Sequence, residues 1–90
     1  MSYGVEFDPK AETYIYSWDL DEVLCNEVYR HLDEELSERP TKYLRDVGGT
    51  MQYSCRVLHN GVQHLFVFRV RYSQSEETLI IWQCFYYPLR

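Results

Sequence analysis

The chain has 90 residues, of which 46% are hydrophobic and 17% aromatic; this composition excludes a disordered segment and fits one domain spanning residues 1–90. No apolar run approaches the roughly 18–20 residues that cross a bilayer, and no secretory signal pattern is visible, so we expect a cytoplasmic protein that does not contact a membrane. The net charge is −5, with eleven acidic and three basic side chains in residues 1–39 and three acidic and six basic ones in residues 40–90.

Residues 3–7 predict a short strand that is followed directly by a helix. Apolar residues alternate in it with polar or small ones, as on a strand with one buried side. Asp8 can accept hydrogen bonds from the first free N–H groups of a helix, and Pro9 suits its first position because proline has no N–H to satisfy. The sequence therefore predicts a first helix from Pro9 to about Ser17.

A second, longer helix is predicted between Asp19 and Pro40. Asp19 and Glu22 have the spacing of a capping box, and leucine or valine recurs at every fourth position after it. The other side of the helix carries many carboxylates, which we interpret as a solvated face, with a cation or partner site as the alternative. Pro40 ends the helix, and residues 41–50 are interpreted as a connector.

Residues 51–87 predict three antiparallel strands rich in β-branched and aromatic side chains. The dipeptide Asn60-Gly61 is preferred in two-residue type I′ turns, because both central residues need a positive φ. A turn at this position fixes the register of the first hairpin, in which Arg56 faces Leu65.

The second turn is the polar stretch 73–77, and a five-residue connection there pairs Phe68 with Trp82 and Val70 with Ile80. One face of the three strands is then almost wholly apolar and must be covered. The other face is half apolar and carries three arginines, and we expect it to stay open. The residues predicted on this open face are Gln52, Ser54, Arg56, Leu58, Leu65, Val67, Arg69, Arg71, Leu79, Ile81, Gln83, Phe85 and Tyr87.

The order of these elements predicts a two-layer α+β domain with the topology β-α-α-β-β-β. The helical pair can cover the apolar face of the mainly antiparallel sheet, and the N-terminal strand can join that sheet at an edge. Any function is then expected on the uncovered face of the sheet.

This order, the chain length and the open sheet resemble the RelE/ParE superfamily, the small toxins of bacterial type II toxin–antitoxin systems. The resemblance is carried by the opening VEFDPKAETYI, the helix that ends at Pro40, Arg56, the segment FVFRV at residues 66–70 and the closing LIIWQCFYY. It covers nearly the whole chain and implies a RelE/ParE-like fold. It also implies a toxin that is neutralised by a cognate antitoxin protein and acts on translation or on gyrase.

For the nuclease members of this family, the resemblance implies a ribosome-dependent mRNA endoribonuclease. That reaction needs cations that stabilise the charge on the phosphorane and groups that move protons. Tyr86 is an alternative to Tyr87 for stacking on a base or moving a proton, and His59 and His64 are further acid–base candidates, although a lone histidine is more often structural. The residues that the resemblance assigns to catalysis are Arg56, Arg69, Arg71 and Tyr87.

Departures from the family pattern leave a second, non-enzymatic interpretation open. Leu65 stands where the family commonly has an arginine, the C-terminal end is not basic, and the isoelectric point is near 5.0, whereas phosphate contacts favour a basic protein. The alternative is a non-catalytic module of the same fold that binds a protein partner, or a second copy of itself, through the open face. The residues expected to bind this partner are Leu65, Val67, Leu79, Ile81 and Phe85.

Cys25, Cys55 and Cys84 are odd in number and have neither the spacing of a metal site nor that of a secreted disulfide scaffold. We interpret them as small buried apolar residues. The histidines also lack the spacing of metal ligands, so we expect no metal and no other cofactor.

Overall fold

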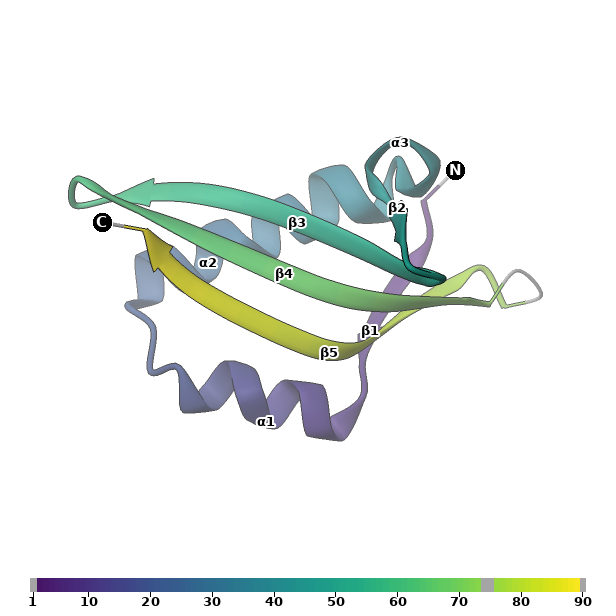
Figure 1. Ribbon diagram of the computed structural model, residues 1–90, viewed down its shortest axis with the longest axis horizontal. Helices are drawn as coiled ribbons and strands as arrows, with labels where there is room; N and C mark the ends of the chain where they lie inside the picture. The colour runs from purple at the N-terminus through teal and green to yellow at the C-terminus, as the bar shows by residue number, and fades with distance from the viewer. Residues whose placement is uncertain (1, 74–75, 90) are drawn as a thin grey trace.

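A computed structural model describes residues 2–73 and 76–89 of the chain. The fold has two layers of the α+β class, with helices packed on one face of a five-stranded sheet, as the sequence predicts (Figure 1). The strands lie in the order β1-β5-β4-β3-β2. The elements along the chain are β1 (Gly4–Phe7), α1 (Pro9–Ser17), α2 (Glu22–His31), η1 (Leu32–Ser37), α3 (Pro40–Tyr43), β2 (Arg45–Val47), β3 (Thr50–His59), β4 (Val62–Ser73) and β5 (Thr78–Leu89).

The two main helices are capped by aspartates, one of them at a different position from the one predicted. Asp8 Oδ1 accepts from Lys10 N at 3.0 Å and begins α1, as expected. Helix α2 is capped by Asp21, whose Oδ1 accepts from Val23 N at 2.8 Å, and the prediction that Asp19 caps it is wrong. Asp19 has a φ of +49°, a left-handed conformation that a helix N-cap does not adopt. The single long helix predicted here is divided into α2 and the wider, π-type helix η1.

The hairpin between β3 and β4 has the register that the sequence predicts. Asn60 and Gly61 have φ values of +52° and +74°, which is the combination that a type I′ turn needs. His59 therefore pairs with Val62, and Arg56 pairs with Leu65 farther along the ladder.

A second two-residue hairpin, which the sequence analysis interpreted as a connector, joins β2 to β3. Gly48 and Gly49 have φ values of +61° and +84°, and Val47 pairs with Thr50 across them. The two glycines adopt these angles without the steric penalty that a side chain would add. Strand β2 thus extends one edge of the sheet and brings Arg45 opposite Gln52.

The register predicted between β4 and β5 is wrong for two reasons. The predicted five-residue connection is one residue too long, because Ser73 pairs with Thr78, and β5 contains a β-bulge. Phe68 pairs with Cys84 and Val70 pairs with Ile81, so Trp82 is an extra residue between two paired segments. From Gln83 onward the side chains lie on their predicted faces of the sheet. In the segment before the bulge, each side chain lies on the face opposite to the predicted one. Leu79 and Ile81 are 0% exposed in the core rather than on the open face, and this contradicts their predicted role in partner binding.

The core lies between the helical layer and the covered face of the sheet. Tyr53 links the two layers because its hydroxyl, which is buried, donates a hydrogen bond of 2.6 Å to Glu35 Oε1 on η1. None of the described helices is long and apolar enough to cross a membrane. The largest fully buried side chains of the core are Tyr53, Phe66, Phe68, Leu32, Leu36, Leu79 and Ile81.

Candidate functional site

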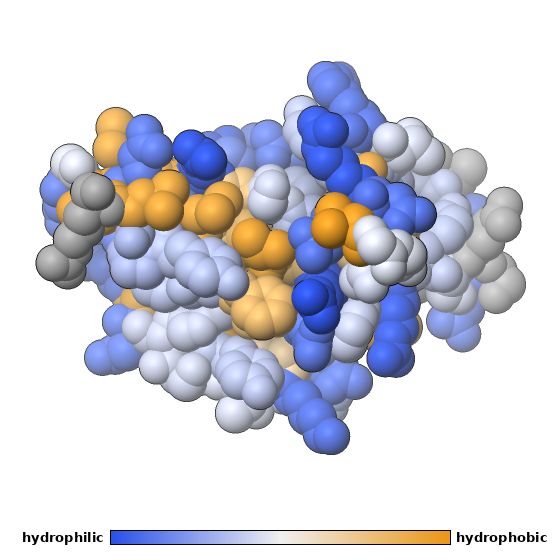
Figure 2. All heavy atoms as spheres, viewed as in Figure 1, coloured by the Kyte–Doolittle hydropathy of each residue, from blue (hydrophilic) through white to orange (hydrophobic). Residues whose placement is uncertain are grey.

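The open face of the sheet is the face opposite the helical layer, and Figure 1 is viewed onto it. Figure 2 shows hydrophobic side chains over the middle of this face with strongly hydrophilic ones beside them. Leu65, Val67 and Phe85 form its apolar centre, where each is half-buried and Val67 pairs with Phe85. Tyr87 lies next to Leu65 and is 49% exposed, in agreement with its predicted position on this face.

Arg69 is held over β5 by a hydrogen bond and by aromatic rings. Its Nη1 donates to Gln83 Oε1 at 2.7 Å, and its guanidinium carbon lies 5.2 Å from the centre of the Phe85 ring. Its Nε is buried, and no atom of the described residues accepts a hydrogen bond from it. The rings and the amide therefore fix the direction of the guanidinium.

Arg71 also points toward β5, because its guanidinium carbon lies 4.9 Å from the centre of the Trp82 ring. Trp82 is the extra residue of the bulge, and Arg69 lies 6.0 Å from the same ring. The register predicted from the sequence puts Trp82 on the covered face, opposite Phe68. Because the bulge turns the indole toward the two arginines, this placement is wrong.

Arg45 and Arg56 add two exposed cations to the open face. Arg56 lies beside Leu65, at the position that the sequence predicts. Arg45 was not predicted, since its segment was interpreted as a connector; the dipeptide Gly48-Gly49, which is typical of short hairpin turns, could have revealed it.

The charges of the protein are separated between its two layers. Four arginines lie on the open face. Among the carboxylates in the described strands, only that of Glu6 on the edge strand β1 lies on the same face. Most of the other carboxylates belong to the helical segments between Asp8 and Glu38. A positive surface with an apolar centre thus lies on a protein whose total charge is −5.

The two histidines of the sheet face the helical layer rather than the arginines. His64 Nδ1 lies 2.6 Å from the Tyr86 hydroxyl, and the Tyr86 ring packs against Trp18 and Phe66. His59 Nε2 lies 3.7 Å from Asp21 Oδ1, next to the loop between α1 and α2. Neither imidazole can therefore exchange a proton with a ligand bound over Arg69 and Arg71, because the sheet separates them. The chemistry that the open face offers is the binding of anionic groups beside an apolar surface.

Cys55 and Cys84 are buried in the core, as predicted, whereas Cys25, for which burial was also predicted, is only half-buried. Burial raises the pKa of both buried thiols to about 12. In residues 2–73 and 76–89, no three His, Cys, Asp or Glu side chains are grouped so that they could hold a metal ion.

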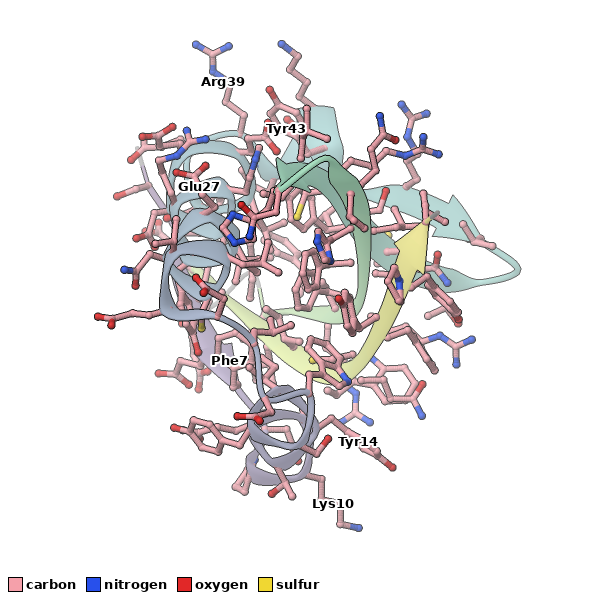
Figure 3. The ribbon with its side chains drawn as sticks, turned by 90° about the vertical axis from the view of Figure 1, so that its left-hand side faces the viewer. Phe7, Lys10, Tyr14, Glu27, Arg39 and Tyr43 are labelled. Carbon is pink, nitrogen blue, oxygen red and sulfur yellow. The ribbon has the colours of Figure 1, made fainter. Side chains whose placement is uncertain are left out.

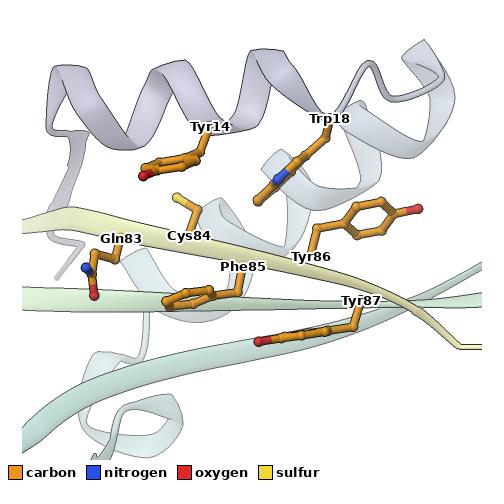
Figure 4. A pocket seen from close by; sticks show the side chains of 7 residues that line it. All are labelled: Tyr14, Trp18, Gln83, Cys84, Phe85, Tyr86 and Tyr87. Atoms are coloured by element: carbon orange, nitrogen blue, oxygen red, sulfur yellow. The ribbon is translucent and has the colours of Figure 1, made fainter.

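A groove of about 280 Å³ lies between α1 and the second half of β5 (Figure 4). Tyr14 of α1 and Trp18, directly after this helix, line one side, and residues 83–87 of β5 line the other. Figure 4 shows Phe85 and Tyr87 on the open-face side of β5, with Tyr14 and Trp18 on the helical side. The groove therefore continues the open face around the edge of the sheet, a feature that sequence analysis did not predict.

Comparisons with known proteins do not assign the chain to a family: no family model matches it, and no curated protein matches it significantly. The resemblance to the RelE/ParE toxins therefore stays a prediction. The open face has to be interpreted from its own chemistry.

Proposed function

We propose that this protein is a non-catalytic binding module whose open face binds a segment of a protein partner that combines acidic and apolar side chains. The observation that carries the proposal is the set of four arginines around the half-buried centre formed by Leu65, Val67 and Phe85. Arginine and aromatic side chains are enriched in protein interfaces, and guanidinium groups bind carboxylates through paired hydrogen bonds.

The charge balance favours a protein partner over a nucleic acid. Binding to nucleic acid derives much of its affinity from phosphate contacts, and a chain of net charge −5 repels a polyanion outside a small basic patch. A short acidic segment needs only local complementarity with the arginines, and the apolar centre of the face adds burial that a phosphate backbone does not use.

A random-peptide display library, selected on the folded protein, tests this proposal. We expect the selected peptides to be enriched in Asp or Glu next to apolar residues. The double variant Arg69→Ala/Arg71→Ala should bind a selected peptide at least about tenfold more weakly, which corresponds to a loss of about 1.4 kcal/mol in binding free energy. Isothermal titration calorimetry measures this affinity.

The matched control for this double variant is Arg39→Ala/Lys42→Ala, which removes the same charge from the helical side. Arg39 and Lys42 are exposed, and Figure 3 shows Arg39 projecting away from the sheet. The control should keep the affinity of the original protein within about twofold, because rim charges that do not touch a ligand contribute little. Equal losses in both double variants would show a general charge effect and would contradict an open-face site.

The toxin prediction is kept as a second candidate because three of the residues it names, Arg56, Arg69 and Arg71, share the open face. Tightly controlled expression in a bacterial host tests it. If the protein is a toxin of this kind, growth should stop with the original chain and continue with the triple alanine variant at those positions. Continued growth with soluble, folded original protein would contradict the toxin prediction.

A further inference from the structure

The second half of β5 has a free edge, along which residues 2–73 and 76–89 place no neighbouring strand. Strand β1 pairs in parallel with β5 only from Thr78 to Ile81, and the last link is the hydrogen bond of 2.8 Å from Asp8 N to Ile81 O. The chain then turns into α1, while β5 continues to Leu89. An unpaired edge of this kind is a template for another extended segment.

The register of the sheet shows which backbone groups of β5 point toward this edge. In the β3–β4 hairpin, His59 and Val62 close a two-residue turn and share both hydrogen bonds, and hydrogen-bonded pairs alternate from there. The backbone groups of odd-numbered β4 residues consequently bond to β5. The backbone N–H and C=O groups of Phe85 and Tyr87 are therefore hydrogen-bonded to β4. The N–H and C=O groups of the alternate residues Cys84 and Tyr86 point away from the sheet.

Nothing in the described part of the chain takes up these edge groups. The hydrogen bonds of the turns, caps and loops in residues 2–73 and 76–89 do not include the backbone of Cys84 or Tyr86. Pro88 faces the same edge by alternation, and proline is tolerated at such a position because its missing N–H would have had no partner. The edge thus offers two donors and at least two acceptors spaced as in a β-ladder.

The side chains around the edge distinguish its two sides. On the helical side, Tyr14 and Trp18 form an aromatic wall, and Tyr14 is 55% exposed. On the open-face side, the guanidinium groups of Arg69 and Arg71 lie over Phe85 and Trp82, which belong to β5 itself. Because they lean onto β5, their charges lie above the strand that borders the free edge instead of one strand farther away.

We propose that an extended segment with alternating acidic and apolar residues adds to the free edge of β5 as a further strand. Its backbone would bond to Cys84 and Tyr86, its apolar side chains would lie against Tyr14 and Trp18, and its acidic side chains would lie beside Arg69 and Arg71. Strand addition obtains affinity from main-chain hydrogen bonds and specificity from alternate side chains. The inference rests on the proposed function, since it supplies the binding mode of the same acidic partner.

The test uses a synthetic octapeptide of four Glu-Val repeats, blocked at both ends, and a control peptide with four Glu followed by four Val. The readout is amide hydrogen exchange of the full chain, followed by NMR. In the free protein, the amides of Phe85 and Tyr87 should exchange slowly and those of Cys84 and Tyr86 quickly. The alternating peptide should slow exchange at Cys84 and Tyr86, and the block peptide should not.

Two variants of α1 provide a side-chain control for the groove. Tyr14→Ala should weaken binding of the alternating peptide about tenfold, a factor that corresponds to about 1.4 kcal/mol. Tyr16 is on the same helix, is 69% exposed and does not line the groove, so Tyr16→Ala should change the affinity less than about twofold. Equal effects of the two substitutions would overturn the groove as the binding place.

The outcomes separate the binding mode from the proposed function. Peptide binding that requires Arg69 and Arg71 but leaves Cys84 and Tyr86 exchanging quickly would overturn strand addition and keep the open face as a site. Protection of both amides without peptide, rising with protein concentration, would overturn the proposal in favour of a second copy at this edge. Absence of binding at about 1 mM peptide, equivalent to less than about 4 kcal/mol of affinity, would overturn it as well.

Discussion

Replacing Ile81 by alanine is expected to lower the free energy of unfolding by about 2–5 kcal/mol. The side chain is fully buried in the core, so the substitution removes apolar contacts and leaves a cavity. Ile80→Ala is the matched control, because Ile80 is only half-buried and faces the open side of the sheet. It should cost less than about 1.5 kcal/mol, since part of its surface already contacts water.

Urea denaturation followed by tryptophan fluorescence measures both values. The comparison tests the bulge directly, because the register predicted from sequence exchanges the faces of these two neighbours. A larger loss in Ile80→Ala than in Ile81→Ala would mean that β5 pairs without the extra residue Trp82. The open face would then lack the indole against which Arg71 packs.

The free energy of unfolding is expected to fall as the pH rises from about 8 to about 10, because two buried thiols keep their protons in the folded state. Burial raises the pKa of Cys55 and of Cys84 to about 12, whereas a thiol of the unfolded chain ionises at about pH 8.5. Above that pH the unfolded state releases protons that the folded state retains, so unfolding becomes more favourable. Each thiol can contribute a slope of at most about 1.4 kcal/mol per pH unit.

Urea denaturation at several pH values measures this slope. The double variant Cys55→Ala/Cys84→Ala should lose most of the decrease in the same pH range, although its stability at neutral pH will be lower. Cys25→Ala is the comparison: burial also raises the pKa of the Cys25 thiol, but the side chain is only half-buried, so this variant should lose a smaller part of the decrease. A slope that is identical in the original protein and in the double variant would contradict the expected cause. Tyr53 should add to the decrease in stability at higher pH, because burial and its hydrogen bond to Glu35 raise the pKa of its hydroxyl.

The bulge in β5 connects the core to the candidate site. It rotates the segment before Trp82 so that Leu79 and Ile81 enter the core, and it directs the indole toward Arg69 and Arg71. Bulges commonly re-aim a side chain in this way next to functional surfaces. Here the result is that aromatic rings of β5 contact two guanidinium groups whose long side chains would otherwise extend freely over an exposed sheet.

The sequence by itself determined the α+β layers, the hairpin at Asn60-Gly61 and the positions of Arg56 and Arg69 on the open face. A two-residue turn with two positive φ angles admits one register, and strict alternation along β3 and β4 then assigns every side chain to a face. These are local properties, and a local pattern can therefore predict them.

Only the tertiary structure decided the face of residues 79–81, the place of Arg45 and the free edge of β5. Leu79, Ile80 and Ile81 are all apolar, so no alternation shows which of them is buried, and a loop of uncertain length before them does not fix the register. The edge of β5 is free because β1 is only four residues long and the chain continues from it into the helix α1, which cannot pair with a strand. That outcome depends on how separate elements pack against one another, which no single stretch of the sequence encodes.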